Sequence, residues 1–218
     1  MKLKRTTIGE IPEEWELRNL DEIATLFQYG ISRLGKKVGA VPILRMNSLE
    51  DGRIKTDDLQ YLDSDEVDLA SYLLERGDIL FNRTNSYDWV GQTALFDIGD
   101  PYVFASYMLR LRCRPGLADP RFVNAYLNSP SSQARLKRIA TRGVSQSNIN
   151  ASSLRSFQVV VPPLHEQTRI ADMLETADNL VQVNLSRRLS LERVKTGLMQ
   201  DLLIGRVRFP EFVNGAST

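Results

Sequence analysis

The sequence predicts a mixed α/β (α+β) globular domain followed by one long C-terminal coiled-coil α-helix. Up to about residue 160, short apolar segments alternate with proline, glycine and asparagine, which is typical of short strands and helices. From Leu164 to about Ile204 there is no proline and one glycine, and apolar residues recur at steps of three and four. This spacing indicates one apolar stripe along a helix.

Local signals give the elements in order. Pro12 disfavours a helix at Ile11, so residues 8–12 are expected to be extended, and Asn19 predicts a capped short helix over 19–24. Strands are expected at 41–46, 78–81, 92–96, 107–113 and 157–161, and helices at 119–127 and 131–141. We expect the globular domain to cover residues 1–162, the helix 163–205 and a tail 206–218.

Composition excludes several classes of protein. The 28 basic and 27 acidic residues leave a net charge of +1, so any surface for a polyanion requires local segregation of charge. The single cysteine, Cys113, excludes an intramolecular disulfide and a cysteine-built zinc site. The chain has neither an apolar stretch of membrane-spanning length nor an N-terminal signal segment, and a cytoplasmic protein is expected.

Catalytic signatures are missing from the sequence. It has no glycine-rich phosphate loop, and one histidine, His165, cannot build a histidine metal cluster. Pro162-Pro163 lacks the polar and aromatic neighbours that adenine methyltransferases place around a proline pair. The acidic run over 57–68 is expected to be a solvated loop. We therefore expect no catalytic residue, metal ligand or cofactor in this chain.

Three predicted loops combine arginine with amides, hydroxyls and aromatics. Arginine and lysine suit guanine edges, asparagine and glutamine suit adenine, and hydroxyls and lysine suit phosphates. Arg83 and Gln146 are the expected base readers, and Arg33, Lys36, Lys37 and Arg142 the expected phosphate contacts. The alternative for each loop is an ordinary hydrogen-bonded surface. The candidate DNA-binding residues are Gln28, Tyr29, Ser32, Arg33, Lys36 and Lys37; Asn82, Arg83, Thr84, Asn85 and Ser86; and Arg142, Ser145, Gln146 and Asn148.

The long helix is expected to pair with another helix, most simply that of a second copy, through residues 165–204. Asn184 lies on the stripe, where a polar residue can fix the register, and Arg188 and Lys195 are expected beside it. The alternative is a helix packed wholly on its own domain. The expected dimerisation residues are Ile170, Leu174, Ala177, Val181, Asn184, Leu191, Leu198 and Leu202.

Two motifs carry a resemblance to a known family. Pro162-Pro163-Leu164-His165-Glu166-Gln167 runs into the helix, and Gly197-Leu198-Met199-Gln200-Asp201-Leu202-Leu203-Ile204-Gly205 ends it. With Ile11-Pro12-Glu13-Glu14-Trp15 near the start, the chain resembles the specificity subunit of type I restriction-modification systems over nearly its whole length.

The resemblance implies a target-recognition domain that reads half of a split site in double-stranded DNA, and antiparallel helices that act as a spacer. It implies docking to DNA methyltransferase (modification) subunits, which bind S-adenosylmethionine and methylate adenine, and to a restriction motor-nuclease subunit. The usual member has two such domains and two helices. This chain has one of each and resembles a half-subunit, for which a homodimer on a split palindrome is expected.

Two other functions stay open at this point. A small self-sufficient metal-dependent nuclease would need a carboxylate cluster, for which Glu75 and Asp78 are the starting point. A coiled-coil assembly protein would use the helix alone for association and its domain to bind protein.

Overall fold

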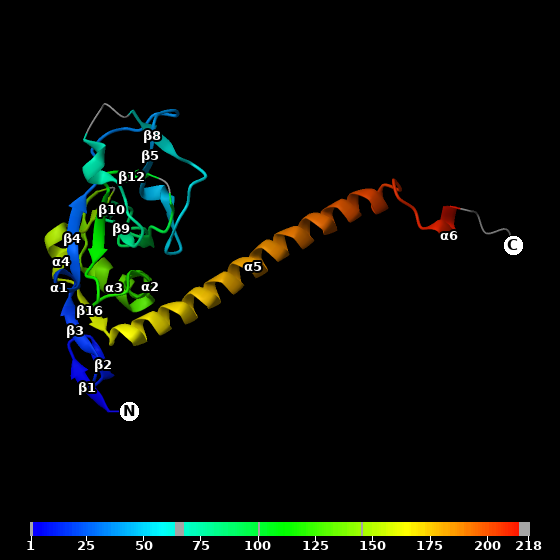
Figure 1. Cartoon of the computed structure of the whole chain (residues 1–218). Coiled ribbons are helices and arrows are strands. Elements are labelled where there is room, and N and C mark those ends of the chain that lie inside the picture. Colours follow the sequence, from blue (N-terminus) through cyan, green and yellow to red (C-terminus); the bar gives the residue numbers. More distant parts are fainter. Residues whose placement is uncertain (1, 64–67, 100, 145, 214–218) are drawn as a thin grey trace. The chain divides into compact units, whose positions relative to one another are not determined.

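The computed structural model describes residues 2–63, 68–99, 101–144 and 146–213, and Figure 1 labels its elements. The chain divides into two compact units, Met1–Ala171 and Asp172–Thr218. This division falls later than the boundary expected after residue 162, because the first turns of the long helix belong to the core of the first unit.

A six-stranded sheet forms the centre of the first unit, in the order β4-β13-β9-β11-β7-β6. Its pairs are antiparallel except for β11 with β7. All five residues of β9 are buried, since the strand has neighbours on both sides and packed layers on both faces. The strands are β4 (Ala24–Tyr29), β6 (Leu49–Glu50), β7 (Arg53–Ile54), β9 (Asp78–Asn82), β11 (Thr93–Leu95) and β13 (Met108–Cys113).

Four smaller sheets surround this one, in the orders β1-β2, β16-β3, β12-β5-β8 and β10-β15-β14. Figure 1 shows the β1–β2 hairpin at one end of the domain and the β12-β5-β8 sheet at the other. The strands are β1 (Leu3–Thr6), β2 (Gly9–Pro12), β3 (Glu16–Asn19), β5 (Val41–Leu44), β8 (Gln60–Leu62), β10 (Thr84–Asn85), β12 (Val103–Phe104), β14 (Thr141–Arg142), β15 (Ser147–Asn148) and β16 (Gln158–Val161).

Capping residues begin the helices of the domain. Asn19 and Glu22 form a reciprocal capping box at the first helix. The side chain of Asp119 accepts a hydrogen bond from the backbone N–H of Arg121 at 2.9 Å. The helices are α1 (Leu20–Ile23), α2 (Pro120–Asn128), α3 (Pro130–Ile139) and α4 (Ala151–Arg155), with 3-10 turns at Met46–Ser48 and Leu69–Tyr72.

Two arginines of β13 converge on one buried carboxylate. Asp78, 1% exposed, accepts from Nε and Nη2 of Arg112 at 2.7 and 3.0 Å and from Nη1 of Arg110 at 3.5 Å. Arg110, 5% exposed, also donates to the carbonyl oxygens of Leu73 and Ser71 at 2.6 and 3.0 Å. This cluster ties the segment before β9 to the sheet.

The long helix α5 (Leu164–Leu203) begins inside the domain core. Gln167, 0% exposed, accepts from the backbone N–H of Asp119 at 2.9 Å and donates to the carbonyl oxygens of Leu117 and Pro162 at 2.9 and 2.8 Å. The side chain of Gln167 therefore supplies the hydrogen-bond partners that these buried backbone groups would otherwise lack.

The remainder of α5 lies in the second unit, where its residues are almost all exposed. Gly205 follows the helix with a φ of +71°, a left-handed conformation that terminates helices. Its N–H donates to the carbonyl oxygen of Leu202 at 3.2 Å. A short helix, α6 (Pro210–Val213), comes next. The mixed α/β fold with one long C-terminal helix is confirmed, and so is Gly205 as the expected stop.

We expect Asp78→Ala to lower the free energy of unfolding by about 3–5 kcal/mol, because Arg110 stays buried without its carboxylate. Urea unfolding of the purified chain measures this loss. The matched control is Glu75→Ala, which removes a carboxylate bonded to Arg112 at 2.9 Å but 68% exposed. That pair should contribute less than about 1 kcal/mol. Equal losses for the two variants would contradict the argument from burial.

Candidate nucleic-acid interface

Two of the three predicted polar loops come together around the sheet β10-β15-β14. Thr84 and Asn85 pair antiparallel with Asn148 and Ser147. The side chain of Asn148 donates to Oγ1 of Thr84 at 2.8 Å, and the backbone N–H of Ile149 donates to the carbonyl oxygen of Arg83 at 2.9 Å. Residues far apart in the sequence therefore share one surface, which we call the β10–β15 surface: Tyr29, Arg83–Tyr87, Arg142, Gln146 and Asn148.

Part of the first loop joins this surface through a ring. The guanidinium carbon of Arg83 lies 4.9 Å from the ring centroid of Tyr29. Nη1 of Arg83 donates to the carbonyl oxygen of Ser106 at 3.3 Å, and the hydroxyl of Tyr29 accepts from the backbone N–H of Ala151 at 3.3 Å. This cation–π contact restrains the guanidinium, and its Nε is buried without a hydrogen-bond partner, so the Nη atoms are the donors that can reach a ligand.

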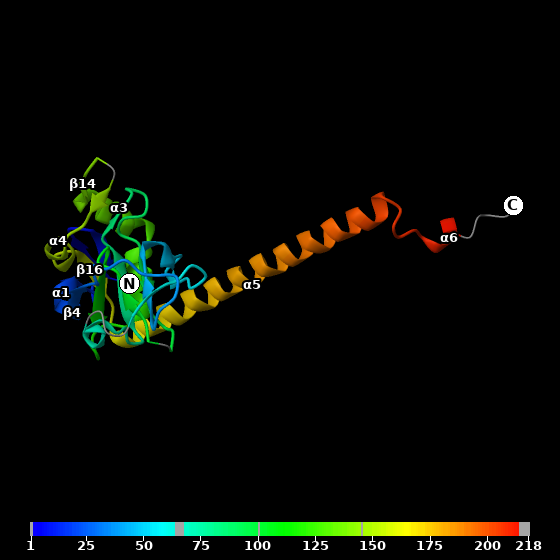
Figure 2. The same ribbon diagram turned by 90° about the horizontal axis from the view of Figure 1, so that it is seen from above.

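A second arginine of this surface also lies over a ring. The guanidinium carbon of Arg142 is 4.0 Å from the ring centroid of Tyr87, and Nζ of Lys137, on α3, is 5.6 Å from it. Figure 2 shows β14 close to α3, which precedes it in the chain. Arg142 and Gln146 are both exposed and can reach a ligand, whereas Ser145 lies outside the described residues.

Other predicted contacts lie elsewhere. Asn82 is 1% exposed, so its side chain cannot reach a ligand in this conformation. Gln28 lies in β4 rather than in a loop, where its carboxamide accepts from Arg110 and donates to the carbonyl oxygen of Ser71. Both side chains point inward from strands of the central sheet.

Residues 32–37 form a separate exposed loop that is bonded to β8. The backbone groups of Lys36 and Tyr61 exchange hydrogen bonds of 2.8 and 2.9 Å, and Nζ of Lys36 lies 2.6 Å from Oδ2 of Asp63. The carboxylate of Asp63 offsets part of the charge that Lys36 was expected to offer to a phosphate. Ser32, Arg33 and Lys37 are exposed on the same loop.

Sequence reasoning missed three residues beside the β10–β15 surface. Neither Trp89 nor Lys137 is among the predicted contacts, and Tyr107 is predicted only as part of a strand. The carbonyl oxygen of Tyr107 accepts from the backbone N–H groups of Arg83 and Thr84 at 3.0 and 3.2 Å. Two aromatic residues, Tyr87 and Trp89, within one polar turn were the available signal.

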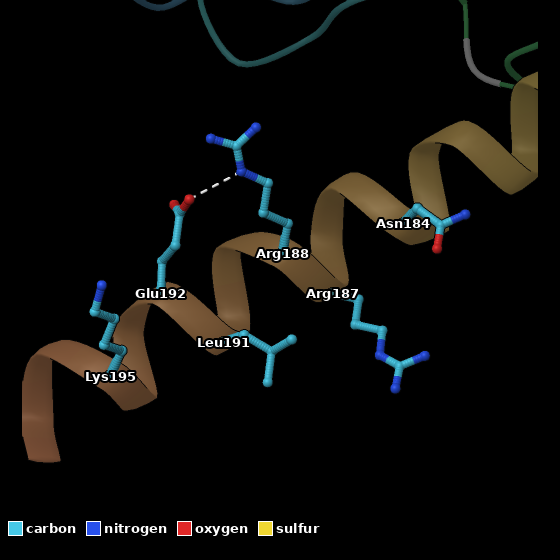
Figure 3. A pocket seen from close by; sticks show the side chains of 6 residues that line it. All are labelled: Asn184, Arg187, Arg188, Leu191, Glu192 and Lys195. Atoms are coloured by element: carbon cyan, nitrogen blue, oxygen red, sulfur yellow. Dashed lines mark hydrogen bonds and ion pairs between the residues drawn. The ribbon is translucent and has the colours of Figure 1, made fainter.

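The middle of α5 departs from the expected apolar stripe. The stripe residues Leu174, Val181 and Leu202 fall on one seven-residue repeat. Arg188 and Lys195 occupy the two positions of this repeat between Val181 and Leu202, so both lie on the stripe rather than beside it. Figure 3 shows a shallow depression lined by Asn184, Arg187, Arg188, Leu191, Glu192 and Lys195. In it, Nε of Arg188 lies 2.9 Å from Oε1 of Glu192.

The stripe begins later than expected. Ile170 is half-buried and packs on the domain core, so it is not part of the exposed stripe. Leu174, Val181, Leu191, Leu198 and Leu202 are 38–59% exposed. Asn184 is exposed, and its Nδ2 donates to the carbonyl oxygen of Leu180 at 2.9 Å.

No arrangement for metal chemistry is present in the described part of the chain, where no three histidine, cysteine or acidic side chains are grouped as ligands. Residues 64–67 of the acidic run lie outside it. Asp78 and Glu75, the starting point for a nuclease site, are both bonded to Arg112. The alternative of a metal-dependent nuclease is therefore not supported. No helix among the described residues has the length and apolarity to span a bilayer.

Comparison with known proteins identifies similar sequences. The family described as "Type I restriction modification DNA specificity domain" matches residues 12–193. The chain is 34% identical to a putative type I restriction enzyme MjaX specificity subunit of Methanocaldococcus jannaschii, over 91% of this chain and 48% of that protein. It is 26% identical to the type I restriction enzyme EcoKI specificity subunit of Escherichia coli K12, over 77% of this chain and 39% of that protein.

Solved structures agree on the fold. The HsdS subunit from Thermoanaerobacter tengcongensis superposes with a TM-score of 0.61 at 18% identity, covering 92% of this chain and 51% of that one. The type I restriction-modification S subunit from M. genitalium gives 0.57 at 20% identity, covering 82% and 42%. The chain spans about half the length of the curated relatives it matches.

Proposed function

This chain belongs to the type I restriction-modification DNA specificity family, and we propose that it reads one half of a bipartite site in double-stranded DNA. The observation that carries the proposal is the β10–β15 surface, where segments distant in sequence bring two arginines and several amides and hydroxyls together. Such side chains form the hydrogen bonds that distinguish base edges and hold phosphates.

The proposal assigns recognition, not catalysis, to this chain. Docking to DNA methyltransferase subunits supplies the chemistry: those subunits bind S-adenosylmethionine and transfer its methyl group to adenine. A restriction motor-nuclease subunit completes the complex. The absence of a grouped carboxylate site among the described residues is compatible with this division of labour.

Within the surface, the two arginines have different roles. Arg83 is half-buried, with its guanidinium over the ring of Tyr29 and Nη1 bonded to Ser106, and this restraint suits its Nη atoms to one base edge. Arg142 is exposed and suits a phosphate, to which it contributes mainly charge.

The helix stripe supports pairing of α5 with the same helix of a second copy. Its apolar side chains, Leu174 and Val181 on one side of the polar middle and Leu198 and Leu202 on the other, are exposed in one chain, and exposed apolar surface of this kind marks an association site. In a parallel in-register pair, Arg188 and Lys195 would each face the same residue of the partner subunit, and like charges would repel across the seam.

An antiparallel pair avoids this repulsion. In one antiparallel register, each polar residue of the stripe lies opposite a polar or a small residue. The amide of Asn184 faces the guanidinium of Arg188, and the small Ala177 leaves room for the aliphatic stem of Lys195. Apolar residues then face one another on both sides of the axis. The facing pairs are Leu174 with Leu198, Ala177 with Lys195, Val181 with Leu191 and Asn184 with Arg188 of the partner subunit.

The first test is the DNA sequence itself. A two-fold pair of identical readers should select two identical short elements in inverted orientation, separated by a fixed unread spacer. Half-sites centred about 34–36 Å apart lie on one face of the duplex, within the length of about 60 Å of a 40-residue helix. Mapping of methylated adenines in cells that carry this gene with its modification subunit should find one adenine in each element.

An asymmetric methylated site, found when this chain is the only specificity protein present, would contradict self-pairing. Loss of sequence preference altogether, with the modification subunit present, would contradict recognition and favour an assembly role.

The second test separates base reading from phosphate contact. Arg83→Ala should relax the choice at one base position by about 1–3 kcal/mol, and Arg83→Lys should relax it too, because lysine lacks the planar fork. Arg142→Ala should weaken all duplexes alike and lower the salt slope of binding by about one unit. Competition binding over a range of salt concentrations measures both effects. An unchanged base preference in Arg83→Ala would contradict its assignment.

The third test fixes the register of the helices. When mixed under oxidising conditions, chains with Val181→Cys and chains with Leu191→Cys should cross-link to each other, because the two positions face across the axis. The matched control mixes chains with Leu174→Cys and chains with Leu191→Cys. These two positions face each other only if the helices slip by one heptad, so they should not cross-link. Burial raises the pKa of the native Cys113 thiol to about 12, so it should not interfere. Self-cross-linking of Val181→Cys would indicate a parallel pair.

A further inference from the structure

Exposed aromatic side chains concentrate beside the β10–β15 surface. In the described part of residues 1–171, four aromatic side chains are exposed: Tyr29 at 45%, Tyr87 at 38%, Trp89 at 51% and Tyr107 at 41%. All four are connected to the segment 83–89, by the stacking of Arg83 on Tyr29, by hydrogen bonds to the carbonyl of Tyr107, or by sequence. Exposed tyrosine and tryptophan side chains are enriched at contact surfaces, so this grouping marks the segment 83–89 as a candidate contact.

The most exposed of these rings, that of Trp89, stands on a rigid turn. The carbonyl oxygen of Ser86 accepts from the backbone N–H groups of Trp89 and Val90 at 3.1 and 3.0 Å. Val90 is 0% exposed and belongs to the domain core. Gly91 follows with a φ of +92°, and its carbonyl oxygen accepts from Nε2 of Gln133 at 2.9 Å. The turn is fixed at both ends, so the indole cannot retreat into the core.

Charge around the turn favours an anionic partner. Arg142 and Lys137 lie over the ring of Tyr87, and neither forms an ion pair with a described residue. Asp88 is the one acid of the turn. A partner that offers both negative charge and flat aromatic faces satisfies the cations and the rings together, and nucleic acid has both. A protein partner would use the same rings, as interfaces are enriched in tryptophan, tyrosine and arginine.

We propose that Trp89 stacks on a base of the bound DNA and acts as a wedge beside the base-reading arginine. The inference rests on the proposed function and extends it, because an inserted ring unstacks a base step. The site would then depend on how easily that step deforms, in addition to the hydrogen bonds made to its bases.

Fluorescence tests the proposal directly. The sequence has two tryptophans, Trp15 and Trp89, so Trp15→Phe leaves Trp89 as the single reporter. Addition of a duplex carrying the methylated sequence should quench its emission and protect it from acrylamide. Trp89→Ala should weaken binding about 5- to 150-fold, and Trp89→Phe should recover part of the loss. The salt slope should stay unchanged, because a stacked ring releases no counterions.

Leu3→Ala is the matched control, since Leu3 is 50% exposed on the β1–β2 hairpin, and it should leave binding unchanged. The stacking proposal is wrong, while the proposed function stands, if duplex binding leaves the Trp89 emission of the Trp15→Phe chain unaltered and Trp89→Ala binds the duplex with full affinity. If Trp89→Ala instead impairs only assembly with the modification subunit, the turn is a protein contact and the proposal is wrong. No duplex binding by the unaltered chain, with the modification subunit present, would overturn the proposed function and the stacking proposal together.

Discussion

The pairing of β9 with β13 at the centre of the six-stranded sheet is the interaction on which the rest of the domain depends. Its register runs from Met108 opposite Asn82 to Arg112 opposite Asp78. At one end of β9, Asp78 is bonded to two arginines; at the other, the strand continues into Arg83 and β10. A slip of one residue would turn every side chain of β9 to the opposite face. It would separate the buried charges and displace the candidate recognition surface at the same time.

That dependence explains which parts of the site the sequence could predict. The polar composition of the loops was visible, but their association rests on β10, β14 and β15, which have two residues each and no alternation of apolar side chains. Gln28 and Asn82 were misplaced for a related reason. Both are polar residues that follow apolar residues near the end of a strand, and only the packed structure tells whether such a residue turns inward. The sequence predicts Tyr29 and Arg83 as separate candidates. Their contact with each other joins residues 54 positions apart, and it is seen only in the folded structure.

Elements with strong end signals were predictable, among them α1 with its capping box, α2 opened by Asp119-Pro120, and α5 ended by Gly205. β4 was missed because Ala24–Tyr29 has no regular alternation of apolar and polar side chains. On α5, the predicted stripe consists of apolar residues and Asn184, with Arg188 and Lys195 beside it, although the seven-residue repeat from Val181 runs through both. The burial of Gln167 and Ala171 could not be inferred either, because it results from contact with the domain rather than from helical periodicity.

The polar residues on the stripe have a consequence for the proposed DNA site. In the proposed helix pair, an entirely apolar seam would tolerate parallel pairing and several antiparallel registers. Asn184, Arg188 and Lys195 would instead favour one register, at some loss of association strength. A slip of one heptad would shift the paired helices, and the domains attached to them, by about 10 Å. At about 3.4 Å per base pair, this corresponds to roughly three base pairs of spacer. The few charges in the middle of the helix would therefore select the partner's orientation and also determine the spacing between the two half-sites.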